Sequence, residues 1–67
     1  MLRSYMMEFY SGVSHVGTRS LIAQSATDAV TEARYMLRHA WDTNRSLTHA
    51  EVLDVRDDVE VVATVNL

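Results

Sequence analysis

Three histidines, His15, His39 and His49, are the side chains of this chain best suited to bind a metal ion. Zinc sites combine histidine and cysteine ligands at short spacings along the chain. The chain has no cysteine, and no two of its histidines stand at such a spacing. We therefore expect solvated histidines, no bound metal and no cofactor.

Groups for catalysis are equally sparse. Asp57 and Asp58 are adjacent carboxylates, but they fall in a predicted hairpin turn, where burial raises a carboxylate pKa little. No serine stands in the context of a nucleophile elbow. A chain of 67 residues also leaves little room for an enclosed pocket. The sequence predicts a protein that is not an enzyme.

A small basic cluster is predicted near the end of a helix, where Arg34, Arg38 and Arg45 follow one another beside Tyr35. Nucleic-acid binding usually needs a longer basic stripe with interleaved aromatic residues. Three arginines make a weak electrostatic footprint, which the acidic part of the chain opposes. Direct nucleic-acid binding is therefore an alternative and not the main expectation.

Charge is distributed unevenly along the chain. The formal net charge is −3, and residues 42–67 carry six carboxylates against two arginines. A chain this short buries roughly 60% of its unfolded surface, and without cysteine it has no disulfide to add stability. A partner or a second copy is the remaining source of stability. No apolar run approaches the ~20 residues that span a bilayer, and no signal peptide is visible, so we expect a cytoplasmic protein.

One helix is predicted over about residues 26–41. Apolar residues there recur every three or four positions: Ala26, Ala29, Val30, Ala33, Leu37, Ala40 and Trp41. Ser25 is placed to cap the first turn, and Asp28 follows three residues later. The small alanines favour close packing of this helix on a sheet, with Leu37 and Trp41 as its large anchors.

Four strands are predicted, over residues 4–12, 18–24, 49–55 and 59–67. The first turn is placed at His15-Val16-Gly17, with Gly17 in the left-handed conformation, and the last at Arg56-Asp57-Asp58. This register puts Phe9 opposite Ala23 and Tyr10 opposite Ile22. The order β-β-α-β-β predicts one α+β domain over residues 1–67, with a single helix packed on one face of an antiparallel four-stranded sheet.

The alternation of residues along these strands separates a predicted core from an uncovered face. The core comprises Met7, Phe9, Leu21, Ala23, Val30, Ala33, Leu37, Trp41, Leu53, Val55, Val61, Ala63 and Val65. The face turned away from the helix carries Met6, Tyr10, Ile22, Val52 and Val62, with Ala50. A contiguous apolar patch of this kind often marks an interface, so we expect it to bind another protein.

The last hairpin is acidic, with Glu51, Asp54, Asp57, Asp58 and Glu60, and its register brings Asp54 opposite Glu60. Such a cluster complements a basic groove on a partner and speeds association. The simpler interpretation is that these charges keep the protein soluble and protect a sheet edge.

The run from Ser20 to Ala29, a strand that enters an alanine-rich helix through a serine cap, is typical of small phage proteins. With its length, element order and acidic balance, the chain resembles the small phage-encoded anti-CRISPR proteins. The resemblance implies a non-enzymatic inhibitor that docks on a CRISPR effector complex in a bacterial host and blocks DNA binding or activation. A small homodimeric structural or regulatory protein and a weak nucleic-acid binder remain the alternatives.

Overall fold

The computed structural model describes residues 2–55 and 59–67. Its elements are β1 (Arg3–Ser11), β2 (Ser14–Ala23), α1 (Ala26–Thr43), β3 (His49–Asp54) and β4 (Glu60–Asn66). The predicted α+β class and the order β-β-α-β-β are therefore confirmed. The predicted turn at Arg56-Asp57-Asp58 lies outside the described residues.

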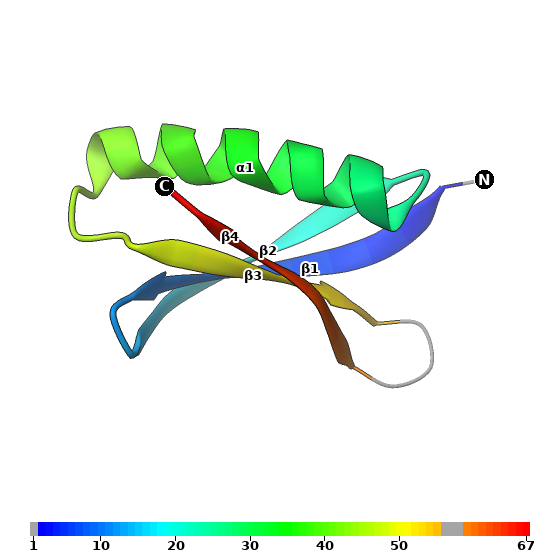
Figure 1. Cartoon of the computed structure of the whole chain (residues 1–67), viewed down its shortest axis with the longest axis horizontal. Coiled ribbons are helices and arrows are strands. Elements are labelled where there is room, and N and C mark those ends of the chain that lie inside the picture. Colours follow the sequence, from blue (N-terminus) through cyan, green and yellow to red (C-terminus); the bar gives the residue numbers. More distant parts are fainter. Residues whose placement is uncertain (1, 56–58) are drawn as a thin grey trace.

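The four strands form one sheet in the order β2-β1-β3-β4, and each neighbouring pair is antiparallel. The chain leaves the sheet at the end of β2, an edge strand, and returns through α1 to β3 on the far side of β1. This connection lays α1 across one face of the twisted sheet (Figure 1). No other described element covers the opposite face.

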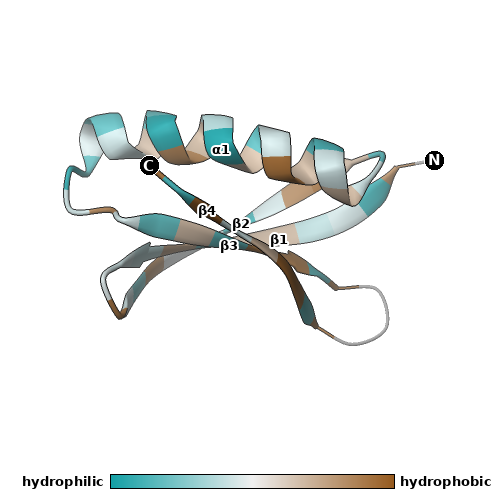
Figure 2. Cartoon of the chain, in the orientation of Figure 1, coloured by the Kyte–Doolittle hydropathy of each residue, from teal (hydrophilic) through white to brown (hydrophobic). Residues whose placement is uncertain are grey.

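The helix begins where the sequence predicts, because the Ser25 side chain accepts a hydrogen bond from the Asp28 backbone N–H at 3.2 Å. It ends at Thr43, followed by Asn44, whose N–H donates to the Ala40 carbonyl. Its buried residues are Ala29, Ala33 and Leu37. Figure 2 shows the apolar residues of α1 on the side that faces the sheet.

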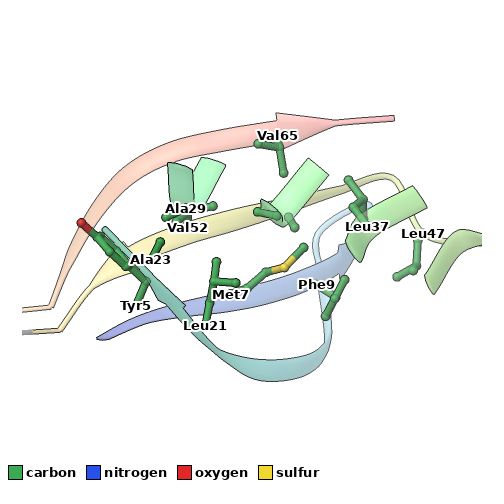
Figure 3. Packing of buried hydrophobic residues seen from close by; sticks show 12 residues of the cluster. Tyr5, Met7, Phe9, Leu21, Ala23, Ala29, Leu37, Leu47, Val52 and Val65 are labelled. Atoms are coloured by element: carbon green, nitrogen blue, oxygen red, sulfur yellow. The ribbon is translucent and has the colours of Figure 1, made fainter. Parts of the chain in front are cut away.

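The core lies between α1 and the sheet (Figure 3). It consists of Tyr5, Met7, Phe9, Leu21, Ala23, Ala29, Ala33, Leu37, Leu47, Ala50, Val52 and Val65. Met7 has no exposed surface and lies at the centre of β1, opposite Val52. Val30 and Trp41, both predicted core residues, are only partly buried and pack at its margin.

The predicted turn between β1 and β2 was wrong. Ser11 pairs with Ser14, and Gly12, with a φ of 61°, supplies the left-handed residue of a two-residue turn. Phe9 therefore pairs with Gly17, and Tyr10 with His15 across a β-bulge. The observed partner of Phe9, Gly17, is an even number of residues away from the predicted partner, Ala23. The residues of β1 and β2 therefore keep their predicted faces.

The predicted faces of β3 were also wrong. Val52 and Ala50, expected on the uncovered face, are fully buried beneath α1. Leu53, expected in the core, points the other way and lies opposite Met6. Val55, likewise expected in the core, follows the strand and is only partly buried.

A β-bulge explains the corresponding error in β4. Val52 pairs with Ala63 and Leu53 with Val61, so Val62 is the extra residue. Val61, expected in the core, lies opposite Leu53 and is 49% exposed. Val62, expected on the uncovered face, instead lies beside Val30 of α1. Two successive valines give no alternation, so the sequence does not specify which one faces the helix.

Candidate functional site on the open face of the sheet

We call the sheet surface turned away from α1 the open face. The strand registers arrange its central part in three rows that cross the sheet. The aromatic row is His15, Tyr10 and His49. The carboxylate row is Thr18, Glu8, Glu51 and Thr64, and the apolar row is Ser20, Met6, Leu53 and Val61.

Tyr10 is the centre of the aromatic row. Its ring stacks on His49, with the centroids 5.0 Å apart and the planes 5° from parallel. On the other side His15 meets Tyr10 edge-on, with a centroid distance of 5.5 Å. Aromatic pairs at these separations favour such offset and edge-on arrangements. The three rings form one continuous surface across β2, β1 and β3.

The carboxylate row brings two negative charges together, because Glu8 and Glu51 are directly opposite each other on β1 and β3. Like charges in this position destabilise a sheet unless a cation or a donor lies near. The Tyr10 hydroxyl donates to Glu8 Oε2 at 3.3 Å. Hydrogen bonding to Glu51 is the main cause that raises the pKa of Tyr10 to about 12, and the charges of both carboxylates add to it. The phenol therefore remains a neutral donor between two acceptors.

His15 lies at the β2 end of this cluster. Its Nε2 lies 3.7 Å from Glu8 Oε1 and 3.2 Å from the Thr18 hydroxyl. This end of the open face is therefore both acidic and aromatic, which suits the recognition of a cationic group.

Backbone and side-chain contacts hold the aromatic row in place. The Thr48 backbone N–H donates to the Tyr10 carbonyl at 2.9 Å, and the Thr48 hydroxyl accepts from the Gly12 N–H at 2.9 Å. The same hydroxyl lies 2.8 Å from His49 Nδ1. The β1–β2 turn is thereby tied to the segment that enters β3, so the site rests on paired strands and not on a free loop.

The apolar row gives the open face its hydrophobic part. Met6 lies between Ser20 and Leu53, and Val61 follows Leu53 on the edge strand. Leu53 is 7% exposed, whereas Val61 is 49% and Ile22 is 64% exposed. Exposed aliphatic side chains beside a polar, aromatic cluster are typical of protein interfaces.

The structure places Met6, Tyr10 and Ile22 on the open face, as the sequence predicts, and brings Asp54 opposite Glu60. Val52 and Val62 lie on the side of α1 and are therefore not part of the candidate site. Asp57 and Asp58 lie outside the described residues. Sequence reasoning missed five contributors: Glu8, His15, His49, Leu53 and Val61. For His15 the missing signal was Gly12, because a turn at Gly12 puts His15 beside Tyr10.

The three arginines of the alternative basic cluster are not equivalent. Arg34 and Arg38 line one shallow hollow beside β4. Arg45 instead lies over the Trp41 ring, 3.9 Å from its centroid, and 3.9 Å from an Asp42 carboxylate oxygen. Its charge is thus partly engaged within the protein.

Comparison with known proteins adds no functional assignment. No protein-family model, curated protein or solved structure matches the chain. Over residues 2–55 and 59–67, no group of three histidine or acidic side chains has an arrangement suited to a metal ion. Within the same ranges, no helix has both the length and the apolar character that crossing a membrane requires.

Proposed function

We propose that this protein is a non-enzymatic binding module that docks another protein through the open face of its sheet. The observation that carries the proposal is a sheet face that no described element covers and that combines an apolar row with an acidic, aromatic cluster around Tyr10. Exposed apolar side chains gathered on one face of a small domain often mark an interface.

Different parts of the open face contribute differently to binding. Met6 and Val61 of the apolar row, with neighbouring Ile22, supply apolar area, and Tyr10 supplies an aromatic anchor of the kind that dominates binding energy. Glu8 and Glu51 accept a lysine or arginine of the partner, which relieves their mutual repulsion. Their charges, with those of the acidic hairpin, also accelerate the encounter with a basic partner.

The partner class to test first follows from the resemblance to small anti-CRISPR proteins. CRISPR effector complexes hold nucleic acid in positively charged channels. An acidic module that docks beside such a channel blocks DNA binding or the conformational change that follows it. We propose this inhibitory activity as the specific form of the function, in the cytoplasm of a bacterial host.

The test compares Tyr10→Ala with Tyr35→Ala, which removes an exposed tyrosine from α1. With a partner captured from a bacterial lysate and then purified, surface plasmon resonance gives both rate constants. Tyr10→Ala should raise the dissociation rate at least about tenfold, because truncation of an aromatic anchor costs about 2 kcal/mol or more. Tyr35→Ala should bind as the parent does.

If the partner is a second copy of this chain, light scattering gives the same discrimination. The parent and Tyr35→Ala should be dimers, and Tyr10→Ala a monomer. A larger loss with Tyr35→Ala than with Tyr10→Ala would move the binding surface from the open face to the helix.

A further inference from the structure

A second surface, separate from the open face, runs between α1 and the edge strand β4. Three adjoining hollows follow this line. The first is lined by Val30, Thr31 and Arg34 of α1 and by Val62. The second, of about 330 Å³, shares Thr31 and Arg34 and reaches Asn66. The third continues past Arg38 to Trp41. We call this line of hollows the α1–β4 groove.

The floor of the groove is the outer edge of the sheet. β4 pairs with β3 on one side, and on the other side no described strand pairs with it. The outward N–H and C=O groups of an edge strand are a ready template for another extended chain. The residues of β4 are also apolar over most of its length (Figure 2), with Val61 and Val62 both exposed. The only charged residue in β4 is Glu60, at its start.

The wall of the groove carries two positive charges along its length, and one carboxylate, Asp42, lines its far end beyond Trp41. Arg34 and Arg38 stand one helical turn apart, and both are exposed. Among the described residues neither forms an ion pair, in contrast to Arg45, which lies near Asp42. Guanidinium groups beside a partly apolar groove are suited to bind carboxylates with paired hydrogen bonds.

We propose that the α1–β4 groove accepts an extended, acidic peptide segment of a partner protein, which adds to β4 as a fifth strand. Its backbone pairs with the free edge of β4, and its apolar side chains pack against Val30 and Val62. Its carboxylates meet Arg34 and Arg38. This mode of recognition takes affinity from backbone hydrogen bonds and specificity from alternate side chains.

Two other occupants fit the groove less well. Nucleic acid needs more than two arginines to be held by its phosphates, and it gains little from an apolar lining. A second copy paired through β4 about a two-fold axis would bring the arginine-bearing flanks of both helices towards each other. An acidic strand satisfies the charge, the lining and the sheet edge together.

Fluorescence anisotropy with a labelled peptide of alternating glutamate and valine tests the proposal. The matched peptides carry glutamine or lysine in place of glutamate, and an oligo-dT strand represents nucleic acid. At low salt the glutamate peptide should bind at least about tenfold more tightly than the glutamine peptide, because two charge-assisted contacts are lost. The lysine peptide and oligo-dT should not bind.

The double variant Arg34→Gln, Arg38→Gln should reduce the affinity for the glutamate peptide to that of the glutamine peptide. The control Arg3→Gln, Arg19→Gln removes the same charge from β1 and β2 and should bind as the parent does. In NMR spectra the amides of β4 should shift and gain protection from exchange when the glutamate peptide is bound. Tyr10→Ala should leave this binding unchanged, so the test is independent of the open face.

Several results would overturn the proposal. Equal binding of the glutamate and glutamine peptides would remove the role of the arginines. Absence of peptide binding at about millimolar concentration, or binding of oligo-dT alone, would exclude a peptide groove. Spectral changes confined to the open face would place the peptide elsewhere.

Discussion

At the scale of single residues, the chemistry of the site comes from contacts across strands. Tyr10 was predictable as an outward-facing residue, because it alternates with buried Phe9. Its stacking on His49 and its approach to His15 were not predictable, since they depend on where β1 turns into β2. Two glycines, Gly12 and Gly17, both suit a tight turn, and only Gly12 has a positive φ. One wrong turn therefore removed His15 from the predicted site.

The environment of Tyr10 predicts a specific dependence on alkaline pH. The pKa of Tyr10 is raised from 10.0 to about 12 in the folded protein, chiefly by its hydrogen bond to Glu51. The folded state then retains a proton that the unfolded state releases. Its contribution to stability is therefore complete below pH 10 and is lost as the pH rises to about 12.

Tyr10→Phe tests this prediction, because it removes the ionisable hydroxyl and keeps the ring. Tyrosinate absorbance in the near ultraviolet should show a component that titrates near pH 12 in the parent and is absent from the variant. Denaturation at increasing pH should show a shallower alkaline loss of stability in Tyr10→Phe. Identical titration curves for the two proteins would contradict the hydrogen-bonded arrangement.

At the scale of elements, the helix and strands were predicted best where apolar residues recur at a regular spacing. The helix was well predicted, because its apolar residues recur at one spacing and Ser25 marks its start. The bounds of β4 were predicted to within one residue, but the faces of Val61 and Val62 were not, because both residues are apolar and a bulge separates their faces. The same ambiguity extends to β3, where Val52 and Leu53 are adjacent and both buried. When a strand carries apolar residues on both faces, its sequence pattern does not determine the register, which is then set by tertiary packing.

A matched pair of substitutions checks the faces of β3 and β4. Val52→Thr puts a hydroxyl into the core without a change of shape and should reduce the free energy of unfolding by about 1–3 kcal/mol. Val61→Thr, at a half-exposed position on the open face, should change it by less than about 0.5 kcal/mol. Urea denaturation measures both. Equal losses would mean that Val61 is a core residue after all.

The helix anchor gives a second prediction at this scale. Leu37 of α1 is buried against the sheet and is 1% exposed, whereas Tyr35 on the same helix is 67% exposed. Leu37→Ala should cost about 2–5 kcal/mol, because it leaves a cavity in a small core. Tyr35→Ala should cost much less. A comparable loss in the two variants, measured by urea denaturation, would contradict the packing of α1 on the sheet.

At the scale of the whole molecule, the two layers leave one sheet face that no described element covers. A single helix covers one side of four strands, and the described part of the chain has a radius of gyration of 11.2 Å. The β-β-α-β-β order was sufficient to predict this open face. Its composition was only partly predictable: Met6, Tyr10 and Ile22 were assigned to it correctly, while Leu53 and Val61 occupy the places expected for Val52 and Val62.

The central claim is that a partner binds the open face, and site-specific photo-crosslinking in bacterial cells tests it most directly. A photoreactive phenylalanine replaces Ile22 on the open face in one variant and Glu32 on the exposed side of α1 in the other. Binding through the open face predicts a discrete crosslinked product at position 22 that is absent at position 32 and is lost with Tyr10→Ala. A product at position 32 alone, or one at position 22 that persists in Tyr10→Ala, would contradict the claim.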